Sequence, residues 1–287
     1  MADFPSTKSR KIWALLTVFF IVVIGVGYVF SYVFESPSIL YFAVIFSVAM
    51  SFSSYWFSDK LVLKMSGAKK AQESEYPEVY KSVRELCLNA GLPVPKIYII
   101  DEMQPNAFAT GRDKNHSVVA VTKGLLSKLN NQEVKAVLAH ELSHIKNRDM
   151  LFQTMVVVLV GFISMLSRMF MWGSLFGGNR RNEGPLALVG VVAAILAPLG
   201  AFLIQMAISR QKEFSADSGA AYLMADSEIM ISALRKISAD ETPAKRANGA
   251  TAHLYISNPF KKGNMVKLFR THPTLEDRIK NLRNLRI

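Results

Sequence analysis

The sequence predicts an α+β membrane protein that is predominantly helical, with about four transmembrane helices and a polar domain that contains a small β-sheet. Three observations lead to this prediction. Of the 287 residues 51% are hydrophobic, yet 34 are lysine or arginine, which indicates apolar blocks that alternate with basic polar ones. Four blocks contain no charged residue. Short runs rich in β-branched residues, typical of strands, lie between the second and third of these blocks.

The four uncharged blocks are candidates for membrane spans, because crossing a bilayer takes about 20 apolar residues. The first two blocks reach that length, the third has about 18 residues, and the fourth contains Pro198 and Gly200, which could kink it. A cleavable signal peptide is the alternative for the first block. Its apolar run is longer than the usual length of about 7 to 15 residues, which favours a retained anchor. The blocks are residues 12–34, 36–58, 150–167 and 184–209.

Basic residues next to the blocks predict the orientation. They precede the first block, follow the second, and border the third and fourth on their outer ends. The positive-inside rule therefore places both termini and the polar regions in the cytoplasm. The net charge of +12 fits attraction to anionic lipid better than binding of nucleic acid, because no basic cluster is interleaved with aromatic residues. Cys87 is the only cysteine, so no intramolecular disulfide can form, in agreement with a reducing compartment.

The polar segment before the third block predicts one helix and two or three strands. Residues 76–91 have an amphipathic pattern that Gly91 closes. Residues 96–101 and 116–122 predict short strands, and residues 105–111 predict a strand or a loop. If residues 116–122 formed the exposed edge of the sheet, an extended substrate could pair with them through its backbone.

Helices dominate the remaining polar sequence. Asn130 can cap a helix, and Glu133 completes the pattern of a capping box, so a helix is expected to run to about residue 147. Further along the chain we expect helices at 210–226 and 227–238, a loop at 240–263, and a final helix at 272–285 with Pro273 in its first turn.

The pentapeptide HELSH, residues 140–144, lies in the helix that begins near Asn130. Residues four apart on a helix lie within about 40° of each other, so the side chains of His140 and His144 can meet one ion. Glu141 projects about 100° away from His140, beside an open coordination position instead of on the ion. The alternative is a helix that carries two surface histidines. The pattern favours a zinc site.

A catalytic zinc needs a third protein ligand and a free position for water. The segment EFSAD offers Glu213 as the third ligand and Asp217 as the acceptor for the outer N–H group of a ligand histidine. Two apolar blocks separate His144 from Glu213, so both side chains would lie on the same side of the membrane. The alternative is a pair of solvated helix charges.

We expect one zinc ion per chain. Two neutral histidines and one carboxylate would leave the site with a net positive charge, so the ion would keep its Lewis acidity. Glu141 could then take a proton from the attacking water and pass it to the departing amine. The sequence therefore predicts a zinc metalloendopeptidase divided by its membrane segments. The expected parts are a transmembrane hairpin at 1–59, the first part of the cytoplasmic protease domain at 60–149, a second hairpin at 150–209 and the second part of the protease domain at 210–287.

HELSH, EFSAD, PNAFATG and THP, with their hydrophobic hairpins, together resemble the HtpX heat-shock membrane metalloproteases, which are bacterial inner-membrane relatives of the CAAX prenyl proteases. The resemblance implies a zincin-like fold, zinc at His140, His144 and Glu213, Glu141 as the catalytic base, and degradation of damaged or misfolded membrane proteins during stress. Prenyl proteases carry more than four spans, so that branch fits less well.

The resemblance also implies roles for residues outside the two zinc motifs. His272 would stabilise the oxyanion or hold substrate, with a helix-cap histidine as the alternative. Asn106 and Ala107 would face the substrate, with a plain β-turn as the alternative. The expected partners are polypeptide substrates, membrane proteins among them, and the lipid bilayer.

Two other functions are compatible with parts of the pattern. A non-catalytic membrane scaffold with structural zinc would need a fourth protein ligand, which Cys87, His116, His253 or His272 would have to supply. A small transporter would need ionisable residues in mid-membrane, and the four apolar blocks contain no charged residue.

Overall fold

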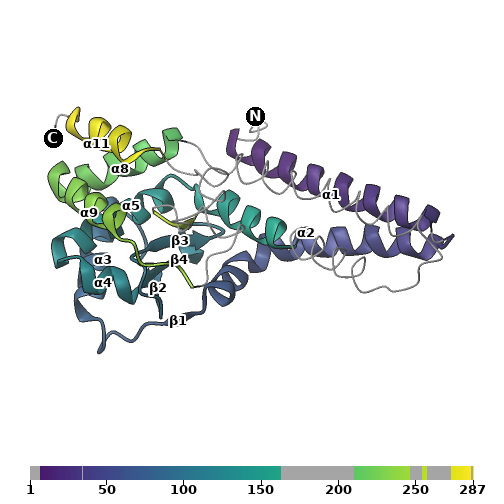
Figure 1. Ribbon diagram of the computed structural model, residues 1–287, viewed down its shortest axis with the longest axis horizontal. Coiled ribbons are helices and arrows are strands. Elements are labelled where there is room, and N and C mark those ends of the chain that lie inside the picture. The colour runs from purple at the N-terminus through teal and green to yellow at the C-terminus, as the bar shows by residue number, and fades with distance from the viewer. Residues whose placement is uncertain (1–6, 34, 163–209, 246–253, 257–272, 286) are drawn as a thin grey trace. The chain divides into compact units, whose positions relative to one another are not determined.

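The computed structural model of the chain describes residues 7–33, 35–162, 210–245, 254–256, 273–285 and 287. These residues form two compact units, which appear in Figure 1. The described part of the first unit consists of residues up to 57 and residues 158–162, and that of the second consists of residues 58–157 and the residues from 210 onward.

The first unit contains α1 (Thr7–Val33) and most of α2 (Pro37–Ser66). The 30 residues of α2 extend about 45 Å at 1.5 Å per residue, more than the hydrocarbon core of about 30 Å. Only 17% of its most apolar stretch is buried, and Tyr41, Phe42 and Ile45 are exposed. A soluble protein would bury such side chains in its core, so α2 has the properties of a membrane helix.

Among the described residues α2 alone is both long and apolar enough to cross a membrane. The apolar stretches Trp13–Tyr28 and Met150–Phe162 are shorter. The expected span at 184–209 and the end of the expected span at 150–167 lie outside the described residues. Four spans therefore remain a prediction.

A mixed four-stranded sheet forms the centre of the second unit, in the order β1-β2-β4-β3. The strands β2 and β4 are parallel, and β1 and β3 pair antiparallel to them on either side. Because β4 has a partner on both sides, residues 116–122 do not form an exposed edge, and the condition for substrate pairing with them is not met. The two edge strands of the described sheet are β1 and β3, and β3 is the neighbour of β4. The strands are β1 (Ala68–Lys70), β2 (Lys96–Ile100), β3 (Ala107–Gly111) and β4 (Ser117–Thr122).

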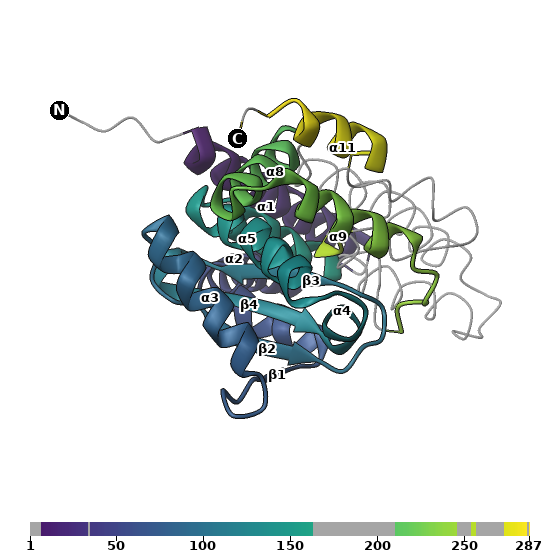
Figure 2. The same ribbon diagram turned by 90° about the vertical axis from the view of Figure 1, so that its left-hand side faces the viewer.

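The two faces of the sheet pack against different elements, since successive side chains of a strand point to opposite sides. Val119 and Val121 of β4 join the main core with α3 and α5, which cross one face in Figure 2. Val118 and Ala120 pack on the other face with Val62 near the end of α2. The helices of this unit are α3 (Pro77–Ala90), α4 (Lys123–Lys128), α5 (Asn131–Lys146), α8 (Arg210–Met224), α9 (Ser227–Ala239) and α11 (Leu275–Arg283).

The helix α5 begins at the predicted capping box. The Asn130 side chain accepts a hydrogen bond from the Glu133 backbone, and the Glu133 carboxylate accepts one from the Asn130 backbone. Glu133 also accepts hydrogen bonds from Ser232 and Lys236 of α9. The start of the HELSH helix is therefore held both by its own cap and by a helix from the second half of the chain.

The last helix begins later than expected. Thr274 is its N-cap, because the Thr274 hydroxyl accepts a hydrogen bond from the backbone N–H of Asp277. Pro273 therefore precedes the helix instead of lying in its first turn. The expected helix end at Gly91 is confirmed, since Gly91 adopts the left-handed conformation with φ of 66° that favours glycine.

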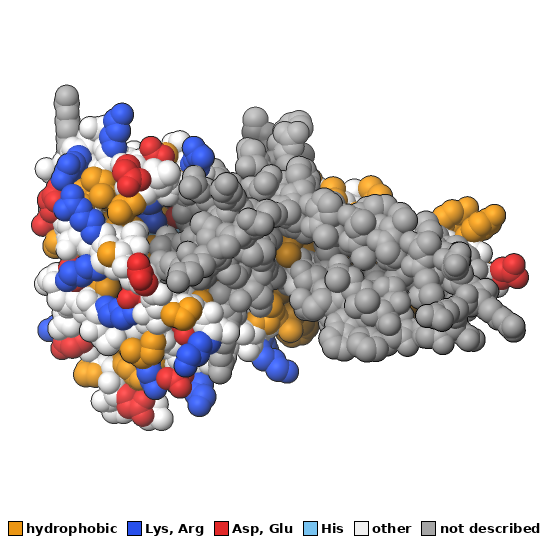
Figure 3. Space-filling view, viewed as in Figure 1, with side chains coloured by type: hydrophobic (Ala, Val, Ile, Leu, Met, Phe, Trp, Pro, Cys, Tyr) orange, Lys and Arg blue, Asp and Glu red, His pale blue; other side chains and the backbone are white. Residues whose placement is uncertain are grey.

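Charged side chains of both signs are interspersed over the second unit on the face shown in Figure 3. Nucleic-acid binding typically uses a continuous basic patch or stripe. The face in view has no such patch over its described residues.

Candidate metal centre

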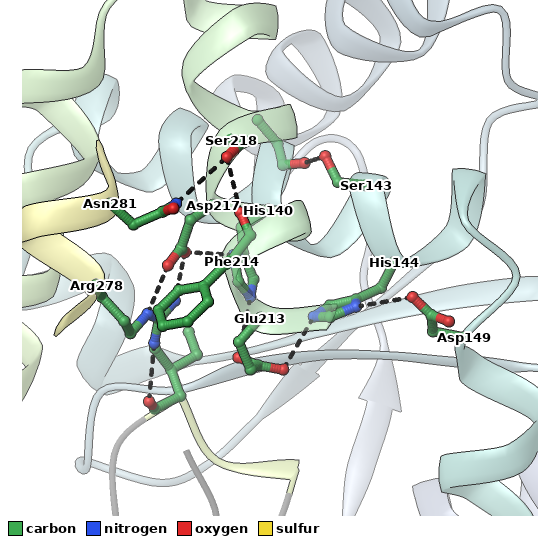
Figure 4. Close-up of polar contacts among 12 residues, drawn as sticks. His140, Ser143, His144, Asp149, Glu213, Phe214, Asp217, Ser218, Arg278 and Asn281 are labelled. Atoms are coloured by element: carbon green, nitrogen blue, oxygen red, sulfur yellow. Dashed lines mark hydrogen bonds and ion pairs between the residues drawn. The ribbon is translucent and has the colours of Figure 1, made fainter. Parts of the chain in front are cut away.

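Three buried side chains from two distant parts of the sequence converge at the packed faces of α5 and α8 (Figure 4). His140 and His144 come from α5 and Glu213 from the first turn of α8. One ligand atom of each residue lies within 4.8 Å of the others. All three side chains are at most 7% exposed, which contradicts the interpretation of the histidines as surface residues.

The distances between these ligand atoms suit a zinc ion. Nε2 of His144 lies 3.5 Å from Oε1 of Glu213, and Nε2 of His140 lies 3.8 Å from Oε2 of the same carboxylate. Zinc bonds of about 2.1 Å in a tetrahedral arrangement place neighbouring ligand atoms about 3.4 Å apart. The donor set of two imidazoles and one carboxylate suits zinc, and the separations of up to 4.8 Å would have to shorten toward this value when the ion binds.

Each histidine has a carboxylate behind its outer nitrogen. Nδ1 of His140 lies 2.9 Å from Oδ1 of Asp217, as the sequence predicts. Nδ1 of His144 lies 3.8 Å from Oδ2 of Asp149, a residue that the sequence analysis missed. A carboxylate at hydrogen-bond distance, such as Asp217, fixes the tautomer and orientation of a ligand histidine, whereas Asp149 at 3.8 Å places a negative charge near His144.

The turn after α5 brings Asp149 back to His144. Arg148 has φ of 56°, and the backbone N–H of Asp149 donates to the carbonyl of His144. This is the hydrogen bond of a Schellman motif, with arginine in the left-handed position that glycine usually occupies. Lys212 of α8 lies 3.3 Å from the other oxygen of Asp149. The signal in the sequence was the RD pair directly after the helix.

Arg278 of α11 holds Asp217 from the other side. Its Nε and Nη2 donate to the two carboxylate oxygens at 2.7 and 2.6 Å. Burial alone would raise the pKa of Asp217, but Arg278 holds it below its usual value. Burial lowers the pKa of His140, which favours the neutral imidazole that a metal requires. No motif in the sequence singles out Arg278.

Glu141 lies in a cleft beside the three ligand atoms. Its side chain is buried, and burial together with the nearby Glu213 raises its pKa to about 7. The backbone N–H of Ala109 in the edge strand β3 donates to this carboxylate. Glu141 is thus poised near neutral pH, as general acid–base catalysis requires. The cleft is lined by Phe108, Ala109, His140, Glu141, His144, Gln153, Glu213, Leu254, Tyr255 and Ile256.

The resemblance assigned three residues to substrate or oxyanion binding, and the structure describes two of them. Asn106 is buried, and its amide binds the chain itself: Nδ2 donates to the carbonyl of Leu254, and Oδ1 accepts from the backbone N–H of Ile256. Ala107 is also buried, at the start of β3. Neither residue is among those that line the cleft. His272 lies outside the described residues.

Close packing of α5 on α8 depends on Gly219. A Cβ atom at this position would lie 2.5 Å from Oγ and 2.9 Å from Cβ of Ser143, and Ser143 precedes the ligand His144. In an open helix, alanine in place of glycine stabilises by about 1 kcal/mol. Here the clash would force apart the two helices that supply the ligands.

We expect Gly219→Ala to reduce the free energy of unfolding by about 1 to 3 kcal/mol and to weaken zinc binding. Thermal unfolding and competition with a chelator measure the two effects. Ser143→Ala removes the nearer of the two clashing atoms, so it should restore part of both losses in the double variant. Full stability and zinc affinity in Gly219→Ala would contradict this packing argument.

Comparison with known proteins gives matches to one protein family. Residues 73–286 match the family model described as Peptidase family M48. A protein named Protease HtpX homolog from Desulfatibacillum aliphaticivorans is 47% identical over 85% of this chain and 80% of its own length. Protease HtpX homologs from Thermococcus kodakarensis and Ralstonia nicotianae are 44% and 43% identical, and they cover 91% and 97% of this chain and 90% and 96% of their own lengths.

A solved structure shares the fold. The crystal structure of S. mikatae Ste24p matches 95% of this chain and 67% of that chain, with a TM-score of 0.50 and 18% sequence identity. At this identity the likeness concerns the fold alone.

Proposed function

Since this chain belongs to peptidase family M48, and within it to the HtpX proteases, we propose that it is a membrane-anchored zinc endopeptidase that hydrolyses damaged or misfolded membrane proteins. The observation that supports this proposal best is the buried convergence of His140, His144 and Glu213 beside Glu141. Residues 73–286 match a peptidase family, and this constellation gives that activity a chemical basis.

The side chains of the cleft have distinct proposed roles. When bound by the three ligands, zinc supplies the Lewis acidity that activates water and polarises a peptide carbonyl. Glu141 accepts the proton of the attacking water and delivers it to the departing amine. Asp217 holds His140 in place through its outer nitrogen, and Asp149 adds a negative charge on the outer side of His144. His272, outside the described residues, is proposed to assist the oxyanion.

The edge strand β3 offers a binding mode for an extended substrate. Phe108 and Ala109 of β3 line one part of the cleft, and Leu254, Tyr255 and Ile256 line another. An extended peptide that enters this cleft can form backbone hydrogen bonds along the outer edge of β3. Such recognition depends little on side chains, which suits a protease that meets varied damaged proteins.

Membrane anchoring would bring this cleft to its substrates. The long, exposed and apolar α2 supports membrane association. We propose four spans in two hairpins, at 1–59 and 150–209, that flank the two halves of a protease domain facing the cytoplasm, in the inner membrane of a bacterial cell. The basic residues beside the apolar blocks support this orientation.

A scaffold with purely structural zinc is the main alternative. It would require a fourth protein ligand, and the metal-binding group of the described residues includes neither Cys87 nor His116. Cys87 is buried in the main core, and His116 contacts Asp113 and Arg112 at the surface. The three ligand side chains also lie in a cleft together with Glu141, whereas a structural zinc site is closed by four protein ligands.

Metal depletion tests the proposal. We expect a chelator to abolish cleavage of casein by the full chain in detergent, and added zinc to restore it at one ion per chain. Full cleavage by the zinc-free chain would contradict the proposal, and zinc binding without any cleavage would favour the scaffold.

A farnesylated CaaX peptide serves as the competing substrate, since a strong preference for it over casein would favour prenyl-protease activity.

A further inference from the structure

Arg278 is a fully charged side chain in the interior, with only 2% of its surface exposed. It lies on α11, in the last helix of the chain, 61 residues from its partner Asp217 on α8. A guanidinium in such a place needs several hydrogen bonds to offset its desolvation. Each of its three nitrogens donates to the surrounding chain, as Figure 4 shows for Asp217.

Two of these nitrogens bind Asp217, the residue that contacts His140 of the metal centre. The Nε and Nη2 groups grip both oxygens of Asp217, and Oδ1 of that carboxylate lies 2.9 Å from Nδ1 of His140. The fork geometry fixes the plane of the carboxylate, which a single point charge does not do. The orientation of the His140 ring therefore depends on Arg278 through Asp217.

The third nitrogen binds a residue in the wall of the cleft. Nη1 of Arg278 donates to the carbonyl of Ile256 at 3.4 Å. Ile256 belongs to the short segment Leu254, Tyr255 and Ile256, which lines the cleft. The Asn106 amide holds the same segment at the carbonyl of Leu254 and the N–H of Ile256. Asn106 and Arg278 are thus two anchors of one cleft wall.

We propose that Arg278 is a positioning residue that fixes two things at once: the orientation of His140 toward zinc and the position of the cleft wall formed by residues 254–256. This inference rests on the proposed zinc peptidase function. It predicts that zinc affinity and substrate affinity are coupled through a single guanidinium, although Arg278 itself is neither a zinc ligand nor a residue that lines the cleft.

Three substitutions in the full chain separate the two roles. Arg278→Lys keeps the charge but loses the fork, so it should lower zinc affinity by about tenfold, alter the absorption of the Co²⁺-loaded protein and raise KM. Asp217→Asn should lower zinc affinity and, because Arg278 keeps its own bond to Ile256, should raise KM less than Arg278→Lys does. Asn106→Ala should raise KM while zinc affinity stays unchanged. Chelator competition and kinetics on a fluorogenic peptide measure these quantities.

The controls distinguish positioning from plain stability. Arg283→Lys, on the same helix but exposed and 3.9 Å from Glu228, should change neither zinc affinity nor KM. In an Asp217→Asn background, Arg278→Lys should cause no further loss of zinc affinity. The proposal is overturned if Arg278→Lys lowers only the melting temperature, or alters only one of zinc affinity and KM. If the unaltered chain cleaves substrate without zinc, it is the proposed function that fails instead.

Discussion

Exchanging Glu141 for glutamine is expected to lower kcat by about 10³-fold while the chain keeps one zinc ion. Glutamine has nearly the same shape but cannot accept the proton of the attacking water. Glu141 is not one of the three grouped ligand residues, so zinc should stay bound. Hydrolysis of labelled casein gives kcat, and elemental analysis gives the zinc content.

The same helix provides a matched control for this variant. Glu133 is also buried on α5, but its carboxylate binds Asn130, Ser232 and Lys236 at the start of the helix. Glu133→Gln should therefore lower stability and leave kcat unchanged at a temperature where the variant is folded. Undiminished turnover in Glu141→Gln would remove Glu141 from the mechanism, and loss of zinc from that variant would indicate that Glu141 is a ligand.

Local patterns in the sequence predicted the parts of the site that depend on one helix. The capping box at Asn130 and Glu133 and the four-residue spacing of His140 and His144 follow from helix geometry alone. Asp217, one turn after Glu213 in EFSAD, was predicted to accept from one of the ligand histidines, but the sequence did not indicate which, and the structure places it beside His140. For the capping box and for the histidine spacing, one short segment was enough.

Such local patterns could not predict contacts between segments that are distant in the sequence. Arg278 lies in the last helix, and nothing in the sequence near it indicates a partner 61 residues away. The order of strands could not be predicted either, since β-branched runs indicate strands but not their neighbours. For this reason the sequence could only raise the possibility that residues 116–122 form an edge, whereas β1 and β3 are the edges of the described sheet.

The interpretation of Asn106 shows a third kind of limit. The family resemblance implied that it faces the substrate, and in the structure it lies behind the cleft wall. Its amide, however, binds the backbone of Leu254 and Ile256 within the chain. A polar residue in a motif can thus shape a binding site from behind, and only the three-dimensional contacts distinguish this from direct contact with a substrate.

Removing the carboxylate of Glu213 should have an even larger effect on zinc than any change behind the histidines. Loss of an outer supporting group costs about 10- to 100-fold in metal affinity, and Glu213→Ala removes one of three proposed direct ligands. We therefore expect zinc affinity to fall by well over 100-fold and cleavage to be lost. Glu228→Ala, which removes an exposed carboxylate on the next helix, is the control and should retain both.

Thermal unfolding makes this prediction independent of any activity assay. A ligand that binds only the folded state stabilises it by RT ln(1 + [L]/Kd), so excess zinc should raise the melting temperature of the unaltered chain. Glu213→Ala should lose this increase, whereas Glu141→Gln should keep it, because only the first variant removes a proposed ligand. If both variants kept the increase, zinc would bind elsewhere, and the buried cluster on α5 and α8 would have to be held together by hydrogen bonds alone.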